Sequence, residues 1–296
     1  MSPDLKQRLR RRLLGLRFYY RLLDTVRTVA GFGNRHYLDG HSELVSAGFH
    51  PSIKNYEFSN YSQNGEDGII LHLLSKAGVV NRTIVEIGTE DARECNSANL
   101  VLNFGWNACL IEADREWARK AREYLANMDA GDRVKVINED VTPDNINSLL
   151  EQAGVPEEMD VLSIDIDSFD YWVWQAVSGY RPRIVVIEYN ASFGPERSVS
   201  VPAPQDTGGR LPDDTCYHGA SITALQRLGV RKGYDLVGGD SNGVNAFFVR
   251  QDLAAAAGLQ PVLPAQAYRP HRRRSRKKSW QEQFSSIAHL PLVTIE

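Results

Sequence analysis

The chain has 296 residues, of which 42% are hydrophobic and 24% are charged, and its formal net charge is −3. This composition is too apolar for a disordered protein, and the length suits one large domain or two small ones. No apolar run approaches the roughly 20 residues that cross a bilayer, and three scattered cysteines exclude a disulfide framework or a cysteine-rich metal site. Arg17 and Arg21 interrupt the apolar core that a signal peptide needs, so we expect a cytoplasmic protein.

The small net charge hides an uneven distribution of charge along the chain. Residues 1–30 carry eight Lys or Arg against two Asp, and residues 269–296 carry seven basic against two acidic side chains. The remainder holds 33 acidic and 19 basic residues. The sequence therefore describes an acidic body with two basic ends, and each part calls for its own explanation.

Residues 1–60 are expected to lie outside the main domain. Apolar side chains at three- and four-residue spacing predict a helix over residues 4–29, and most of its arginines fall off that stripe. A basic amphipathic helix of this kind suits the inner face of an anionic membrane or a second copy of the chain. Nucleic acid is a poor partner, because the acidic body would repel its phosphates. We therefore expect peripheral membrane attachment or homo-oligomer formation through this helix, and no nucleic-acid binding.

In residues 61–255, short apolar runs alternate with helical patterns. Asn64 precedes a predicted helix from Glu66 to Lys76, which Gly78 ends. Strands are predicted at Thr83–Ile87, Ala108–Glu112, Val134–Asn138, Val161–Asp165 and Ile184–Glu188, with helices between them near residues 95–104, 115–128, 143–152 and 170–178. This alternation is typical of a parallel sheet covered by helices.

The end of this domain has a different pattern. A helix near residues 220–230 is followed by predicted strands at Tyr234–Gly238 and Ala246–Arg250, and the turn between them contains Asn242 and Gly243. Asn-Gly tolerates the positive φ angles of a tight hairpin turn. We therefore expect an α/β fold with a doubly wound, Rossmann-like, mostly parallel sheet that a C-terminal antiparallel hairpin closes, and an added N-terminal helix.

Two segments fit this compact domain poorly. Residues 191–216 contain four prolines and three glycines, and they exceed the roughly 12–15 residues usual for a structureless connection, which is typical of functional lids. Residues 256–296 are expected to form a basic C-terminal tail outside the domain. The basic run Arg269–Lys278 within it should be exposed and mobile, and its charge needs no further role than solubility.

Acidic residues mark the ends of the first three predicted strands. Glu86 and Gly88 end the first strand, Glu112 ends the second, and Asp140 follows the third. Ligands of open α/β sheets bind at these carboxyl ends, and glycine lets a ligand approach the backbone. Each acid taken singly has an equally good explanation as a cap of the following helix. A dinucleotide oxidoreductase is disfavoured, because no G-x-G-x-x-G fingerprint follows the first strand.

The ordered set of strand-end acids, with the terminal hairpin, resembles class I S-adenosylmethionine (SAM)-dependent methyltransferases. The resemblance implies that Glu86 and Gly88 hold the methionine part of SAM, that Glu112 holds ribose and that Asp140 holds adenine. Residues 89–92 depart from the usual glycine-rich loop. A narrower likeness, to FkbM-type methyltransferases and related sugar-modifying enzymes, spans roughly residues 60–253. It is carried by Tyr61–Asp67, Gly105–Trp106, Ser163–Asp167, Glu188–Asn190 and Val244–Val249.

The fourth and fifth strand ends carry a second group of polar side chains. Asp165 and Asp167 are two residues apart, as are Glu188 and Asn190, so each pair leaves one face of its strand. Converging carboxylates repel unless a cation joins them, and oxygen ligands select hard cations such as Mg²⁺. The resemblance to metal-dependent sugar O-methyltransferases implies an ion that orients two substrate oxygens. Alternatively, Asp165 is buried against loop amides and Asp167 caps the helix that begins near Phe169.

His218 is the preferred general base among the seven histidines, because it ends the long loop just before a helix and imidazole titrates near neutrality. A capping or packing role is equally open for it, and Asp167 is the alternative base if no metal binds. Ser62 and Gln63 remain after Asn64, Glu66 and the next acid are explained as helix-start residues. We expect these two side chains to close over the cofactor.

Taken together, the sequence predicts a SAM-dependent O-methyltransferase that methylates a hydroxyl of a sugar or glycan with the help of Mg²⁺. A metal-dependent glycosyltransferase is an alternative, because Asp165 and Asp167 form a D-x-D pair that suits a nucleotide-sugar diphosphate. That alternative leaves Glu86, Gly88 and Glu112 without a common purpose. A non-catalytic scaffold that binds a membrane or partner is the other, because residues 89–92 depart from the cofactor-loop pattern.

Overall fold

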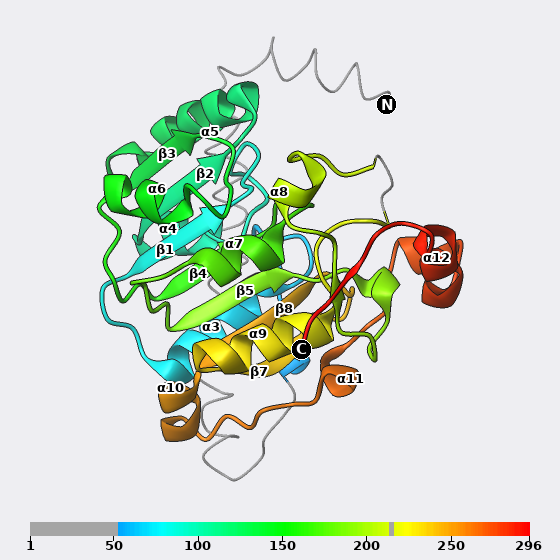
Figure 1. Ribbon diagram of the computed structural model, residues 1–296. Helices are drawn as coiled ribbons and strands as arrows, with labels where there is room; N and C mark the ends of the chain where they lie inside the picture. The colour runs from blue at the N-terminus through cyan, green and yellow to red at the C-terminus, as the bar shows by residue number, and fades with distance from the viewer. Residues whose placement is uncertain (1–52, 213–215) are drawn as a thin grey trace, which may run out of the picture.

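The computed structural model describes residues 53–212 and 216–296. A seven-stranded sheet with the order β3-β2-β1-β4-β5-β8-β7 forms its centre (Figure 1). The strands are β1 (Thr83–Ile87), β2 (Asn107–Glu112), β3 (Val134–Asn138), β4 (Val161–Ile164), β5 (Ile184–Glu188), β7 (Tyr234–Gly239) and β8 (Asn245–Arg250). β1 to β5 pair in parallel, whereas β8 runs antiparallel to both β5 and β7. The expected doubly wound sheet with a terminal antiparallel hairpin is therefore confirmed.

Helices cover both faces of the sheet, because alternate strand residues point to opposite sides. Val85 packs in the same cluster as side chains of α6, α7 and α9, whereas its neighbour Ile84 packs with α3, α4 and α5. The helices are α3 (Glu66–Ala77), α4 (Ala98–Phe104), α5 (Arg115–Asn127), α6 (Ile146–Ala153), α7 (Asp170–Ala176) and α9 (Ile222–Lys232). Burial on both faces explains why β1, β2, β4 and β5 read as mostly apolar runs, whereas the edge strand β3 is only partly buried.

The segment after β5 contains short elements. They are η3 (Ala191–Phe193), β6 (Val199–Ser200) and α8 (Pro204–Thr207). Strand β6 pairs antiparallel with β9 (Val293–Thr294), close to the end of the chain. The long connection is therefore held partly by a two-stranded sheet that the sequence analysis did not anticipate.

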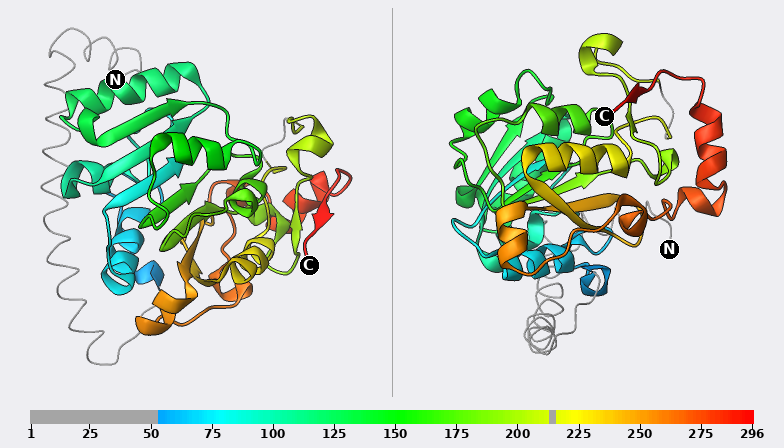
Figure 2. Two further views of the ribbon diagram at one scale, coloured as in Figure 1. Left: turned by 60° about the vertical axis from the view of Figure 1, so that its left-hand side comes forward. Right: turned by 60° about the horizontal axis from the view of Figure 1, so that its bottom comes forward.

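Residues after the hairpin also differ from the separate tail that the sequence suggested. They form α10 (Gln251–Ala256), α11 (Pro264–Ala267), η4 (Arg274–Arg276) and α12 (Trp280–Ile287) before β9. Figure 2 shows this orange-to-red segment running past the hairpin and reaching the 191–212 connection. The Tyr268 hydroxyl donates to the Ala191 carbonyl at 2.8 Å, and the Ser192 hydroxyl contacts the Gln283 side chain at 2.8 Å. The C-terminal segment is thus packed on the body.

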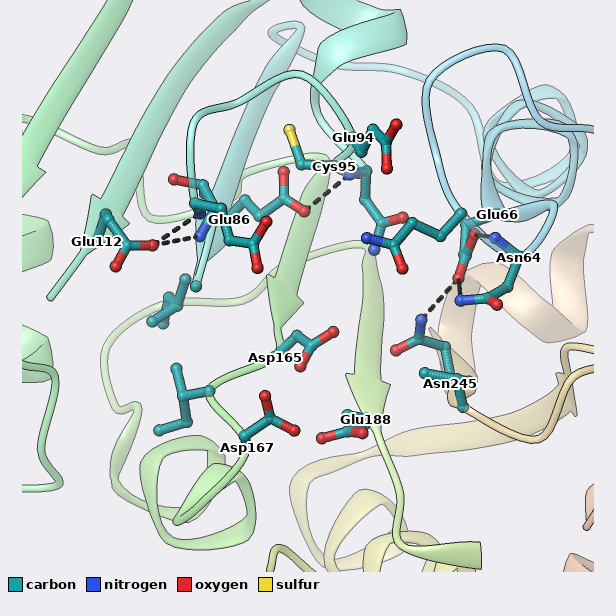
Figure 3. A pocket seen from close by; sticks show the side chains of 18 of the residues that line it. Asn64, Glu66, Glu86, Glu94, Cys95, Glu112, Asp165, Asp167, Glu188 and Asn245 are labelled. Carbon is teal, nitrogen blue, oxygen red and sulfur yellow. Dashed lines mark hydrogen bonds between the residues drawn. The ribbon is translucent and has the colours of Figure 1, made fainter. Parts of the chain in front are cut away.

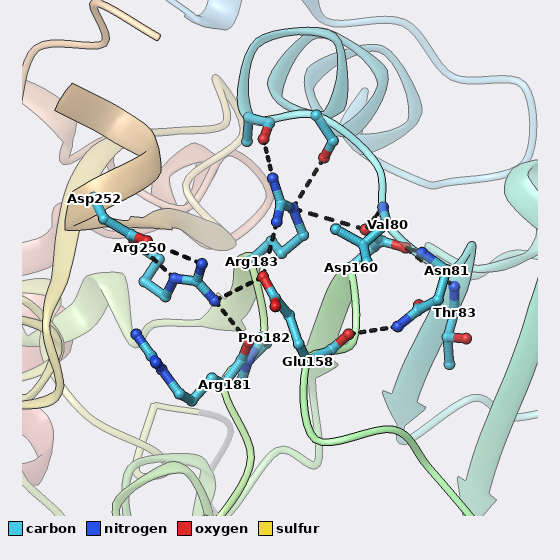
Figure 4. A network of polar contacts seen from close by, with 12 residues as sticks. Val80, Asn81, Thr83, Glu158, Asp160, Arg181, Pro182, Arg183, Arg250 and Asp252 are labelled. Carbon is cyan, nitrogen blue, oxygen red and sulfur yellow. Dashed lines mark hydrogen bonds and ion pairs between the residues drawn. The ribbon is translucent and has the colours of Figure 1, made fainter. Parts of the chain in front are cut away.

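A network of charged side chains lies where the parallel strands begin, at the edge of the sheet opposite the strand-end acids (Figure 4). Asp160 is fully buried and accepts hydrogen bonds from the backbone amides of Val80 and Arg82 at 2.8 and 2.7 Å. Arg183 donates to Glu158 at 2.8 Å and also to carbonyls at the end of α3. These contacts tie the entry of β1 to the entries of β4 and β5, at the edge far from the strand-end acids.

The predicted basic helix over residues 4–29, and most of the segment 1–60, lie outside the described residues. The expected membrane or oligomer contact of that helix therefore stays a prediction. Within residues 53–212 and 216–296, no helix combines the length and the apolar character needed to cross a membrane.

Candidate active site

A cavity of about 990 Å³ opens at the carboxyl ends of the parallel strands (Figure 3). Residues at or just beyond five strand ends line it, and they are Gly88, Glu112, Asp140, Asp165 and Glu188. The turn before α3 and the hairpin turn supply another part of the wall, with Gln63, Asn64, Glu66, Asn242 and Asn245. The sheet edge and these two turns together enclose the space.

Glu86 and Gly88 shape the cavity where β1 ends. The Glu86 carboxylate is buried and accepts the backbone amides of Asn96 and Ser97, both at 2.8 Å, so it fixes the start of α4. Its burial raises the pKa of that carboxyl. Gly88 has a φ of +82°, and a Cβ there would collide with the carbonyl oxygen of Asp165. Glycine is thus required for β1 and β4 to approach each other at the site.

Glu112 holds the loop that follows Gly88. Its carboxylate accepts the amides of Thr89 at 3.1 Å, Glu90 at 2.7 Å and Asp114 at 2.8 Å. Glu90 and Ala92 have φ values of +46° and +59°, in the left-handed region that usually favours glycine. The loop without the glycine-rich pattern therefore keeps a tight turn with the help of this carboxylate. Strained residues of this kind cluster at functional sites.

Three further predicted cofactor residues take different positions. Asp140 is exposed and lines the cavity, and Gln63 lines it as well. Ser62 is buried and exchanges hydrogen bonds with Asp67: the Ser62 hydroxyl accepts the Asp67 amide at 3.0 Å, and the Asp67 carboxylate accepts the Ser62 amide at 2.9 Å. Ser62 thus belongs to the turn before α3, and it is absent from the described lining of the cavity.

The predicted reaction residues gather where β4 and β5 end. Figure 3 shows Asp165, Asp167 and Glu188 beside one another at the cavity. One ligand atom from each of Asp167, Glu188 and His218 lies within 4.8 Å of the others. Burial and neighbouring carboxylates raise the pKa of Asp165 and of Glu188 well above their ordinary values. Burial and mutual repulsion therefore disfavour full ionisation of these carboxyls.

His218 connects this cluster to the C-terminal segment. Its Nδ1 lies 3.5 Å from the Glu188 carboxylate, and its Nε2 lies 3.0 Å from an Arg274 guanidinium nitrogen. Burial and Arg274 lower the pKa of the imidazole, so the neutral ring is favoured. A guanidinium only donates hydrogen bonds, so Nε2 must accept and the ring proton sits on Nδ1, facing Glu188.

The side chain of Asn190, which was predicted as a metal ligand, is hydrogen-bonded to three backbone groups. Its side-chain oxygen accepts the Ser192 amide at 2.9 Å, and its side-chain nitrogen donates to the carbonyls of Cys216 at 2.8 Å and His218 at 2.9 Å. Asn190 thus holds the backbone near Ser192 to the loop that carries His218. The loop-holding role that the sequence left open for Asp165 falls to Asp170 instead, which accepts the amides of Ile166 and Ser168.

The chemistry of the donor set fits a divalent cation in part. Asp167 and Glu188 supply carboxylate oxygens that a hard cation prefers, and Asp165 adds a third nearby. The pKa of Asp165 and that of Glu188 are raised, and the positive charge of a bound cation would lower both by favouring the ionised carboxylates. His218 offers no free lone pair to an ion while Arg274 donates to Nε2 and Nδ1 carries the proton.

The basic C-terminal segment supplies cavity residues that the sequence analysis placed outside the domain. His271, Arg272, Arg273 and Arg276 line the cavity. A second cavity of about 770 Å³ shares Asp167, Glu188, His271 and Arg273 with the first. The only sequence signal for this arrangement was the pairing of an acidic body with a basic run, and charge alone does not say where the run folds.

The sheet order and the antiparallel hairpin define the Rossmann-like methyltransferase fold. Solved structures with similarity include an O-methyltransferase from Bacillus cereus in complex with S-adenosylhomocysteine (SAH), at 17% identity, covering 83% of this chain and 95% of that chain, with a TM-score of 0.41. A putative caffeoyl-CoA O-methyltransferase from Staphylococcus aureus is similar at 15% identity, over 74% of this chain and 99% of that chain, with a TM-score of 0.44.

A third similar structure is the O-methyltransferase TomG from Streptomyces achromogenes, involved in tomaymycin synthesis, in complex with SAM. It shows 18% identity over 64% of this chain and 81% of that chain, with a TM-score of 0.40. No family model matches the chain, and no curated protein matches it either. Any function must therefore be argued from the site.

Proposed function

We propose that the protein is a SAM-dependent O-methyltransferase that acts on a hydroxyl of a sugar or glycan. The observation that carries this proposal is one continuous cavity along the carboxyl ends of β1 to β5. Its first part has the Gly88 turn and Glu112, and its second part has the carboxylates of Asp167 and Glu188. A cofactor in the first part would face an acceptor in the second.

In this proposal, the first part of the cavity binds SAM. The backbone after Gly88 lies against the methionine portion, and Glu112 and Asp140 face the ribose and adenine. Asn245 adds a recognition group on the opposite wall, because its side-chain oxygen is buried without a hydrogen-bond partner among the described residues. That oxygen suits the ammonium group of an amino-acid moiety.

Methyl transfer requires the acceptor hydroxyl to lose its proton as its oxygen attacks the methyl carbon. A new O–C bond forms, the S–C bond breaks, and its electron pair stays on sulfur to give SAH. We assign the proton to Asp167, which is exposed and shared by both cavities. The Nδ1 proton of His218 then faces the Glu188 carboxylate, whose oxygen lies 3.5 Å from Nδ1. If a divalent cation binds to Asp167 and Glu188, it would lower the pKa of the hydroxyl and fix its orientation, and Asp167 would then be a ligand of the cation and not the proton acceptor.

Calorimetry with SAM, SAH and a nucleotide sugar, with and without Mg²⁺, tests the proposal. We expect both adenosyl compounds to bind and the nucleotide sugar not to bind. Glu188→Gln should leave SAH affinity within about twofold of the wild type, because the change lies beyond the cofactor part of the cavity. Failure of both adenosyl compounds to bind would overturn the proposal, and Mg²⁺-dependent binding of the nucleotide sugar would favour the glycosyltransferase alternative.

A further inference from the structure

The basic C-terminal segment forms one wall of the space next to the reacting cluster. Arg273 lines both cavities. The second cavity lacks the β1 and β2 residues assigned to the cofactor, and it shares only Asp140 with that assigned set. Asp167 and Glu188 line both cavities, so the two spaces meet at the reacting group. If the proposed function holds, the second cavity is where the acceptor extends away from the methyl donor.

Backbone and side-chain contacts fix this segment at the cavity. The Tyr189 hydroxyl donates to the Arg269 carbonyl and accepts the Arg269 amide, both at 2.9 Å. The Arg272 amide donates to the Asn242 carbonyl at 2.8 Å. His271 Nδ1 accepts the amides of Arg273 and Arg274 at 3.2 and 3.3 Å, which holds the turn at the start of η4. The arginine side chains therefore project from a fixed backbone.

The arginines of this segment that line the two cavities differ in whether their guanidinium groups have partners among the described residues. Arg274 contacts His218 and Arg272 donates to Asn242. By contrast, neither Arg273 nor Arg276 has a guanidinium hydrogen bond or ion pair with any residue in the described part of the chain, although acidic residues line the same cavity. A guanidinium presents a planar fork that matches a carboxylate or phosphate with two parallel hydrogen bonds.

The second cavity also offers an apolar surface. Phe169 and Tyr217 are buried at 8% and 2% exposure and line it with Leu211. The Tyr217 hydroxyl makes a hydrogen bond to the Pro291 carbonyl, which fixes the ring from the C-terminal segment. Apolar side chains in the same cavity as a guanidinium suit a ring that carries an anionic substituent. The carboxylates of Asp167 and Glu188 would repel that anion unless it lay at the arginine end.

We propose that the acceptor carries an anionic group, a carboxylate or a phosphate, which Arg273 binds in the second cavity while the hydroxyl to be methylated lies at Asp167 and Glu188. This proposal rests on the proposed function for the role of the hydroxyl, but the binding of the anion rests on Arg273 alone. The basic segment thus selects acidic sugars over neutral ones.

Calorimetry of the full chain with glucose, glucuronate and glucose 6-phosphate tests the proposal. Titrations are run in EDTA, so that no divalent ion holds the anion, and both with and without SAH. We expect glucuronate or glucose 6-phosphate to bind at least about tenfold more tightly than glucose, which is the worth of one charge-assisted hydrogen bond. The two anionic probes show whether a carboxylate or a phosphate is preferred.

Arg273→Ala should remove this preference, whereas Lys277→Ala should keep it. Lys277 is an exposed cation of the same segment that lines neither cavity, so it controls for the loss of one charge. Equal affinity for all three probes, or an unchanged preference in Arg273→Ala, would overturn the proposal. So would loss of SAH affinity alone in Arg273→Ala, because Arg273 would then serve the cofactor carboxylate. Absence of SAH binding in the wild type would contradict the proposed function. The titrations without SAH would still test whether Arg273 binds the anionic group.

Discussion

Gly88 controls how closely the backbone of β1 approaches its neighbours at the site. The Gly88 amide donates to the Ile111 carbonyl on β2 at 2.9 Å, and the Asp165 amide donates to the Ile87 carbonyl at 3.0 Å. The chain therefore passes between β2 and the end of β4 with no room for a side chain. Sequence alone marked Gly88 for its place after a strand, but the reason for it is a neighbour 77 residues later in the chain.

Replacement of Gly88 by alanine should damage both stability and cofactor binding. Alanine at a φ of +82° carries the left-handed penalty of about 1 kcal/mol, and collision with the Asp165 carbonyl adds about 1–3 kcal/mol. Gly179→Ala is the matched control, because its φ is +77° and a Cβ there meets nothing within 4 Å. Urea unfolding and SAH calorimetry measure the two effects. Equal losses of stability in the two variants would show that the collision is relieved and that glycine is needed at position 88 only for its positive φ angle.

At the scale of elements, the sequence predicted what local patterns determine. The strand bounds Thr83–Ile87, Val134–Asn138 and Ile184–Glu188 were predicted without error. The first and third of these strands are buried and mostly apolar, whereas the second lies at the edge of the sheet and is only partly buried. The helix expected from residue 95 begins at Ala98, because the backbone amides of Asn96 and Ser97 donate hydrogen bonds to the Glu86 carboxylate. That carboxylate lies on another element, so no local pattern reveals the shift.

The C-terminal elements show where such patterns fail. Strand β9 has only two residues, and its partner β6 lies more than 90 residues earlier in the chain. Helix α12 has a capping box at Ser279 and Glu282, but its apolar side chains pack on the connection after β5. Short elements carry too little periodicity to be recognised, and their partners are distant in sequence. The anionic-acceptor proposal depends on this same packing, which the sequence analysis could not reach.

Truncation of Ile295 tests whether this end of the chain fastens the long connection. Ile295 is 5% exposed, and its amide donates to the Ser198 carbonyl at 2.9 Å. Ile295→Ala should lower the free energy of unfolding by about 2–4 kcal/mol and speed amide hydrogen exchange at residues 198–200. Leu263→Ala, at a side chain 67% exposed on the same segment, should do neither. Unchanged exchange at residues 198–200 in Ile295→Ala would show that β9 does not hold β6.

At the scale of the whole molecule, the formal charge overstates how acidic the body is. Burial raises the pKa of Asp67 to about 6 and that of Asp240 to about 7, although each accepts backbone amides that favour the ionised form. Asp240 holds the hairpin turn through the amides of Asn242, Val244 and Asn245. Both carboxyls accept backbone hydrogen bonds, but their burial disfavours the ionised form, so their ionisation at higher pH lowers the stability of the folded state.

The buried Asp240 makes the stability of the folded protein fall as the pH rises. Its ordinary pKa of 3.8 is raised to about 7 in the folded state, so between these values the folded protein keeps a proton that the unfolded chain has lost. The contribution of Asp240 is therefore greatest below about pH 4, and it falls by about 1.4 kcal/mol per pH unit until it levels above about pH 7.

Asp240→Asn removes this titration and one hydrogen-bond acceptor. The variant should be less stable than the wild type near pH 5, and the deficit should shrink steadily toward pH 8, because only the wild type loses stability over that range. Urea unfolding at each pH unit measures the difference, and contributions from titrating groups that Asp240 does not influence cancel between the two proteins. Asp235→Asn on the same hairpin is the matched control. Asp235 is half-buried, and within residues 53–212 and 216–296 its carboxylate accepts a hydrogen bond only from the exposed Gln251 side chain. Its curve should run parallel to that of the wild type. A deficit of Asp240→Asn that stays constant from pH 5 to pH 8 would mean that Asp240 is ionised throughout, and that the acidic body carries its full formal charge.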